Sequence, residues 1–168
     1  LDSDDYFAKN KIEKVIDYFN KNKNAKIVFD YPLIVENNNI YPEKTKLRFF
    51  KTYWPYIHPT SCISIKKNCF EELLKVISYK DFTDVWLDLR ICLFSKYILK
   101  DFHIINENLT FYRKTTSNIS SKFNKFSKNW WKRRMQAHQY FQKFSRDNEL
   151  NFNKNFDFLI TKLICKFL

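Results

Sequence analysis

The stretch AKIVFDYPLIVE, residues 25–36, is rich in β-branched and aromatic residues and predicts a strand. The run ENNN at 36–39 then breaks the strand, and IYPEK at 40–44 predicts the second arm of a hairpin or an extended excursion. The chain contains no Gly, so we expect Asn to provide the left-handed backbone conformations that turns require.

Helical and extended segments alternate on both sides of this strand. Apolar residues at helical spacing predict a helix over 9–22, and a loop over 47–60 precedes a short strand over 61–67. Asn68 is expected to cap a helix over 69–78, and a helix over 82–100 is apolar nearly all round, which predicts burial. A kinked strand over 102–114 and helices over about 122–146 and 156–168 complete the chain. This order predicts an α/β fold with a few mixed strands, in which residues 1–120 form one domain and residues 121–168 a basic amphipathic helical extension.

Positive charge is concentrated in one block of the sequence. The net charge is +12, and ten Lys or Arg but no Asp or Glu occur between Asn108 and Arg146. Such a block indicates an anionic partner, whether a membrane surface, a nucleic acid or a phosphorylated ligand, or else a solvated helix face. The absence of Gly argues against a Gly-rich phosphate-binding loop.

The four Cys residues predict a reducing compartment. None lies in a C-x-x-C pair, and their spacing suits neither a zinc site nor a disulfide framework, so we expect reduced, mostly buried thiols in a cytoplasmic protein. The apolar run at 156–168 is interrupted by lysines and is shorter than the ~20 residues that span a bilayer. The predicted location is therefore cytoplasmic, with a peripheral position at the inner face of the plasma membrane as a further expectation.

An acidic cluster begins the sequence, in LDSDDYF at 1–7. Asp2 and Asp4 are two residues apart, so at the end of a strand their side chains would point to the same side. Paired carboxylates repel each other unless a cation lies between them, and Mg²⁺ or Mn²⁺ holding diphosphate oxygens is a common solution. In the alternative interpretation, Asp4 or Asp5 caps the helix that follows.

Three segments together resemble family 2 glycosyltransferases, which have the GT-A fold. LDSDDYF resembles the D-x-D segment of that family, and TDVWLDLRI at 83–91 resembles its acidic helix motif, which places the motif's Asp on Asp84. LTFYRKTTSNIS at 109–120 is similar to the family's late Tyr-Arg…Asn-x-Ser segment. The matches occur in the family's order and cover most of the first 120 residues.

The resemblance implies an inverting, metal-dependent transfer from a nucleotide-diphosphate sugar to a glycan or lipid-linked acceptor, in bacterial surface polysaccharide synthesis. It implies that Asp2 and Asp4 bind Mn²⁺ or Mg²⁺, that Asp2, Asp4 and Asp5 contact the donor, and that Asp84 is the general base, with Asp88 as a rival. Thr115 stands where the family often has His, and the absence of a Q-x-x-R-W motif favours transfer of a single sugar. The family's nucleotide-binding half precedes the D-x-D motif, so the resemblance implies a C-terminal fragment that is inactive alone.

Two aromatic stretches complete the candidate site. YWPYIHPTSC at 53–62 occupies the place where the family forms its acceptor pocket, which suggests acceptor contacts by Trp54, His58, Thr60 and Ser61, or else aromatic core packing. NWWKRR at 129–134 combines tryptophans with cations, which is typical of membrane interfaces, and so predicts membrane contact by Trp130, Trp131, Lys132, Arg133 and Arg134. Packing of this helix on the catalytic domain is the other interpretation. The alternative function is a basic membrane- or RNA-binding helical module without catalysis, whereas a nucleic-acid partner is disfavoured for the enzyme.

Overall fold

The computed structural model describes residues 4–43, 54–77, 80–115, 123–151 and 155–168. The chain forms two compact units. The first comprises Leu1–Phe49, Trp54–Ser78 and Leu87–Thr115, and the second comprises Phe50–Tyr53, Tyr79–Trp86 and Thr116–Leu168. The second unit therefore includes 79–86, a segment that a boundary at residue 120 assigns to the first domain.

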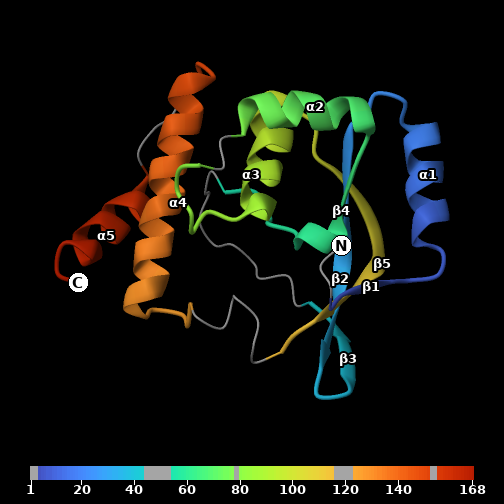
Figure 1. The fold of residues 1–168 in the computed structure, drawn as a ribbon, viewed down its shortest axis with the longest axis horizontal. Coiled ribbons are helices and arrows are strands. Elements are labelled where there is room, and N and C mark those ends of the chain that lie inside the picture. Colours follow the sequence, from blue (N-terminus) through green and yellow to red (C-terminus); the bar gives the residue numbers. More distant parts are fainter. Residues whose placement is uncertain (1–3, 44–53, 78–79, 116–122, 152–154) are drawn as a thin grey trace. The chain divides into compact units, whose positions relative to one another are not determined.

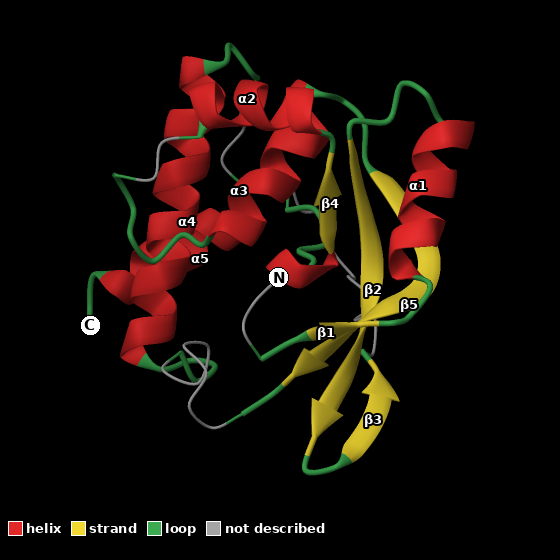
Figure 2. Cartoon of the chain, turned by 45° about the vertical axis from the view of Figure 1, so that its right-hand side comes forward, coloured by secondary structure: helices red, strands yellow, loops and turns green. Residues whose placement is uncertain are grey.

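The first unit is built on a mixed sheet, which confirms the predicted α/β class (Figure 2). Its strands are β1 (Tyr6–Phe7), β2 (Ile27–Glu36), β3 (Asn39–Pro42), β4 (Ile63–Ile65) and β5 (His103–Arg113). In the described residues the strand order is β1-β5-β2-β3. Strands β4 and β3 pair with the same edge of β2, β4 with its first half and β3 with its second half. The β2–β5 pairing is parallel and contains the irregularity expected of a kinked strand, while the other pairings are antiparallel.

The turn between β2 and β3 confirms the role predicted for Asn. Asn37 and Asn38 have φ values of 49° and 65°, in the left-handed region, and Glu36 pairs with Asn39 across the turn. Asn tolerates this region better than other residues with a Cβ atom, because its short polar side chain bonds locally. A two-residue hairpin thus forms without glycine.

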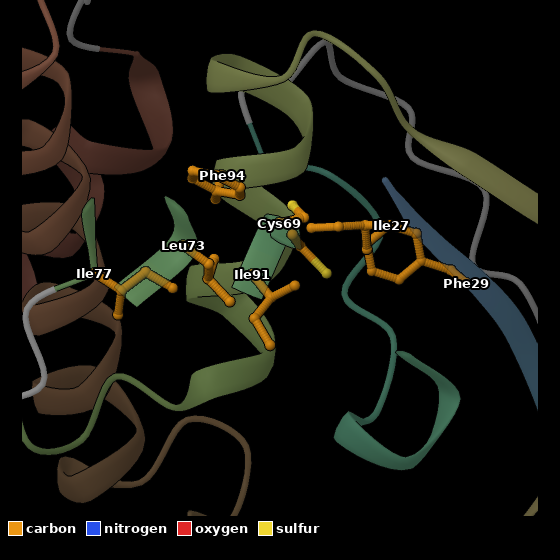
Figure 3. Packing of buried hydrophobic residues seen from close by; sticks show 8 residues of the cluster. Ile27, Phe29, Cys69, Leu73, Ile77, Ile91 and Phe94 are labelled. Carbon is orange, nitrogen blue, oxygen red and sulfur yellow. The ribbon is translucent and has the colours of Figure 1, made fainter. Parts of the chain in front are cut away.

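Helices cover both faces of this sheet (Figures 1 and 2). Helix α1 (Lys11–Lys21) packs Val15, Tyr18 and Phe19 against Val28, Ile105 and Leu109. Helix α2 (Lys67–Val76), helix α3 (Leu87–Leu93) and the π-helical segment η2 (Phe94–Ile98) cover the opposite face. Figure 3 shows Ile27 and Phe29 of β2 directed into this second cluster, as the alternation of side chains along a strand requires.

Several predicted helices begin elsewhere than expected. Asn68 does not cap α2, since the cap position is Lys66 and the side-chain Oδ1 of Asn68 accepts from the neighbouring Cys69 N–H instead. The helix expected from 82 begins only at Leu87, because 83–86 form a turn. The helix expected from 122 is α4 (Lys128–Asp147), which begins after Ser127, whose hydroxyl accepts from the Trp130 N–H at 3.2 Å. The last helix, α5 (Phe156–Cys165), is capped in the same way by Asn155.

All four cysteines are free thiols, and three of them are buried. Burial raises the pKa of Cys62, Cys69 and Cys92, the last to about 12, which makes these thiols poor nucleophiles near neutral pH. Burial raises the pKa of Cys165 as well, but this thiol is partly exposed, so a reagent can reach it in the native protein. We therefore expect one thiol to react readily with a thiol reagent in the native protein and the other three only in denaturant. In the reaction of the native protein with the thiol reagent, a Cys165→Ser variant should lack the rapidly reacting thiol. Rapid reaction of several thiols in the native protein would contradict this prediction.

Candidate functional site

The acidic cluster lies at the start of β1, beside the end of β5. Asp2 falls outside the described residues, and Asp4 is half-buried in the turn before β1. Asp5 is buried, and its carboxylate accepts from the Ser61 hydroxyl at 2.6 Å and from the Arg113 N–H at 2.9 Å. Asp5 therefore ties β1 to β5 and to the 3₁₀ turn η1 (Thr60–Cys62).

A buried ion pair lies next to this cluster. The Lys11 ammonium is 2.8 Å from Oδ2 of Asp30, and the side chains of both residues are 2% exposed. The same ammonium donates to the Ser61 carbonyl at 2.7 Å and to Oγ1 of Thr110 at 2.6 Å, so its three hydrogens are all used. The Thr110 hydroxyl in turn donates to Oδ1 of Asp30 at 2.6 Å. This polar cluster fixes helix α1, β2, β5 and η1 relative to one another.

Desolvation dominates the electrostatics of this cluster. Burial raises the pKa of the Asp30 carboxyl, although Lys11 and the hydrogen bond from Thr110 act in the opposite direction. Sequence analysis did not find the cluster, because Lys11 is 99 residues from Thr110. The available signal was a lone Asp within the apolar run of 25–35, since a carboxylate on a buried strand requires a partner.

The predicted acceptor residues separate into buried and accessible pairs. His58 is fully buried, its Nδ1 lies 2.8 Å from the Asp30 carbonyl, and Phe29 and Tyr56 pack on its ring. Ser61 is 2% exposed and binds Asp5. Trp54 and Thr60 are partly exposed. Of the four, only Trp54 and Thr60 therefore have appreciable surface that an acceptor could contact.

The burial of His58 should make the stability of the folded protein depend on pH. Desolvation lowers the pKa of His58 from 6.5 to about 4, so the unfolded chain binds a proton before the folded protein as pH falls. Stability should therefore be lost between pH 6.5 and pH 4, by about 2 kcal/mol at pH 5 from this residue. Urea titrations measure the free energy of unfolding at each pH. In the His58→Phe variant this free energy should fall less steeply between pH 6.5 and pH 4 than in the wild type, even if the variant is less stable at pH 7. An unchanged slope would contradict the assignment.

Asp84 lies in the second unit, in the turn 83–86. Its Oδ2 accepts from Nε2 of Gln136 at 2.9 Å, and its N–H donates to Oε1 of Gln136 at 3.2 Å. Nε of Arg133 donates to the Asp84 carbonyl at 3.2 Å, and the Arg133 guanidinium stacks 3.3 Å from the ring centre of Trp86. Helix α4 thus holds Asp84 by its backbone and one carboxylate oxygen. The rival Asp88 lies in the first unit, in the first turn of α3, where its Oδ1 accepts from the Leu89 N–H at 2.6 Å.

The stretch NWWKRR is largely engaged within the second unit. The two tryptophan rings are half-buried and meet edge to face at 4.6 Å, and the Trp131 carbonyl accepts from the Cys165 thiol. Arg134 pairs with Asp157 of α5 and stacks on Trp130 at 5.0 Å, while Arg133 binds Asp84 and Trp86. Lys132 is exposed. The packing interpretation therefore describes most of this stretch, and its predicted membrane contact stays a prediction.

The predicted metal site depends on a residue outside the described ranges. Within those ranges no three His, Cys, Asp or Glu side chains come together as metal ligands. Asp2, the expected partner of Asp4, lies outside those ranges. The Mn²⁺ or Mg²⁺ site on Asp2 and Asp4 therefore stays a prediction, as do the nucleotide-sugar donor and the acceptor.

Comparison of this chain with protein-family models, with curated proteins and with solved structures finds no match. The structure therefore shows an α/β fold with a mixed sheet. Assignment to the GT-A fold and to a glycosyltransferase family rests on the three sequence segments alone and stays a prediction.

Proposed function

We propose that this chain is part of an inverting, metal-dependent glycosyltransferase of the GT-A type, which moves one sugar from a nucleotide-diphosphate donor to a glycan or lipid-linked acceptor. The pairing of β1 with β5 carries the proposal. Tyr6 pairs with Phe111 and Phe7 with Thr110, which joins LDSDDYF to LTFYRK, two of the three segments on which the resemblance depends. These segments are about 100 residues apart in sequence, so their adjacency is not a consequence of local structure.

The charges at this end of the sheet suit a diphosphate and its cation. Asp4 lies in the turn just before β1, and Tyr6 of β1 pairs with Phe111, two residues before Arg113. Arg113 and Lys114 are exposed, and the Arg113 guanidinium lies 5.8 Å from the ring centre of Tyr6. A carboxylate for a divalent cation beside an arginine for phosphate oxygens is the arrangement that such a donor requires.

Each acidic residue has a separate role in this proposal. Asp2 and Asp4 would hold Mn²⁺ or Mg²⁺, which neutralises the charge that develops on the leaving diphosphate. Asp5 fixes β1, because both of its carboxylate oxygens already accept hydrogen bonds. Asp84 is the proposed general base, which takes the proton of the attacking acceptor hydroxyl.

The test is the dependence of sugar transfer on Mn²⁺, measured with a panel of nucleotide sugars on the longest native protein that carries this sequence. Asp4→Asn should raise the Mn²⁺ concentration for half-maximal activity by about tenfold or more, because one anionic ligand is lost. Asp17→Asn is the matched control, since Asp17 is an exposed carboxylate on α1. An equal Mn²⁺ requirement in the two variants, or no transfer from any donor, would contradict the proposal.

A further inference from the structure

Helix α5 has two apolar sides, and among the described residues one of them is buried while the other is exposed. Phe158 and Thr161 are buried, and the Phe158 ring meets the His138 ring of α4 at 5.4 Å. At 100° per residue, a second set of apolar residues falls within an arc of about 100° on the opposite side. This outer face consists of four residues of α5, Phe156 (75% exposed), Leu159 (52%), Ile160 (37%) and Leu163 (58%), and of Phe167 (83%), which follows two residues after the helix ends.

Lysines border this outer face. Lys162 and Lys166 are exposed and project from α5 along one edge of the apolar arc. At the other edge the carboxylate of Asp157 pairs with Arg134, so its charge is compensated. Residues 123–151 and 155–168 together contain nine Lys or Arg and three Asp or Glu, a net charge of +6. The surroundings of the outer face are therefore cationic.

A shallow hollow lies beside the same two lysines. Its volume is about 300 Å³, and its lining includes Met135 and Gln139 of α4 with Phe158, Lys162 and Lys166. This lining combines apolar side chains with two lysines, which suits a molecule with an anionic head and an apolar tail. The hollow and the outer face thus favour the same chemistry.

We propose that the outer face of α5 binds an anionic phospholipid surface, with Phe156, Leu159, Leu163 and Phe167 among the acyl chains and Lys162 and Lys166 on the headgroups. An amphipathic helix with large apolar residues beside lysines is typical of helices that lie in the plane of a membrane interface. None of the described helices has the length and hydropathy that a membrane-spanning helix requires.

Two other occupants fit the outer face less well. A second copy packed on this face would bring the lysines of both copies together, whereas anionic headgroups complement them. A single-stranded nucleic acid requires aromatic platforms for its bases, and most of this face is aliphatic. The tryptophans of α4 are half-buried and contact each other and Arg134.

Sedimentation of the longest native protein that carries this sequence, mixed with vesicles, tests the proposal. The chain should bind vesicles in which one third of the phosphatidylcholine is replaced by phosphatidylglycerol, and it should bind pure phosphatidylcholine much less. Leu159→Asn with Leu163→Asn should lower the partition coefficient roughly tenfold or more, because two apolar anchors are lost. Lys162→Gln with Lys166→Gln should lower it roughly 10- to 30-fold and weaken its salt dependence.

Ile12→Asn with Ile16→Asn is the matched control. These isoleucines are also four residues apart on a helix, and at 59% and 52% exposed they match Leu159 and Leu163. The control should bind anionic vesicles as the wild type does, and circular dichroism should show that all variants keep their helices. Equal loss in the control would overturn the proposal. Failure of the wild type to bind anionic vesicles would also overturn it. Loss of self-association in gel filtration by the Leu159/Leu163 variant would then indicate a second copy as the occupant, and loss of RNA binding in a mobility shift would indicate RNA.

Discussion

Lys11→Met should destabilise the protein by about 3–5 kcal/mol, because it leaves the Asp30 carboxylate buried without a counter-charge. The loss has three parts: the ion pair at 2.8 Å, the hydrogen bond to the Ser61 carbonyl and the bond to Thr110. Neither Lys11 nor Asp30 can turn its charge toward water, since both side chains are 2% exposed. Urea denaturation at pH 7 measures the change in the free energy of unfolding.

Lys14→Met is the matched control for this prediction. Lys14 lies on the same helix and pairs with Glu107 at 2.9 Å, but these side chains are 42% and 43% exposed. Solvent screens such a pair, so we expect a much smaller loss of stability than that of Lys11→Met. If Lys11→Met cost no more than Lys14→Met, the polar cluster would not be buried as described.

A double variant separates the pair from the remaining contacts. Lys11→Met with Asp30→Leu removes both charges, and an apolar pair of similar volume avoids the unpaired carboxylate. We expect the double variant to be more stable than Lys11→Met alone, because desolvation of Asp30 dominates the single variant. A double variant as unstable as the sum of the two single variants would mean that the charges do not interact.

Local features of the fold could be predicted from the sequence, and long-range ones could not. Strand β2, the Asn hairpin and helix α1 follow from alternation, turn chemistry and helical spacing, which act over a few residues. Helix starts were less accurate for α4, where Ser127 competes with other polar residues nearby as the cap, whereas α5 begins at Phe156 as predicted. In α1, Lys11 is buried while Ile12 is exposed, an inversion that only the distant Asp30 and Thr110 explain.

In the candidate site, too, the residue types could be predicted from the sequence, whereas their long-range contacts could not. The sequence indicates that carboxylates gather at the start of the chain, but not that Asp5 bonds to Ser61 and to the backbone of Arg113. It likewise identifies His58 as a polar side chain among aromatics, but only the contacts with Phe29, Tyr56 and Asp30 show that it is enclosed. Residue type predicts the chemistry that is possible, and burial decides which residues can perform it.

Asp84→Asn should lower kcat for sugar transfer by roughly 10²–10⁴-fold with little change in KM, if Asp84 is the general base. Asn suits this test because its carbonyl oxygen can still accept from Gln136, as Oδ2 of Asp84 does at 2.9 Å. The contact of Arg133 with the backbone carbonyl of residue 84 should also persist. The turn 83–86 therefore keeps its conformation while the site loses its proton acceptor.

Asp88→Asn and Gln136→Ala complete the comparison, because they separate catalysis from structure. If Asp88 were the base, Asp88→Asn would carry the large loss and Asp84→Asn would be nearly silent. If Asp84 served only to hold α4, Gln136→Ala would match Asp84→Asn or exceed it, and the melting temperature would fall in parallel. A large loss of kcat confined to Asp84→Asn, at an unchanged melting temperature, is the result that the proposed mechanism requires, since only a proton acceptor is lost without a structural contact.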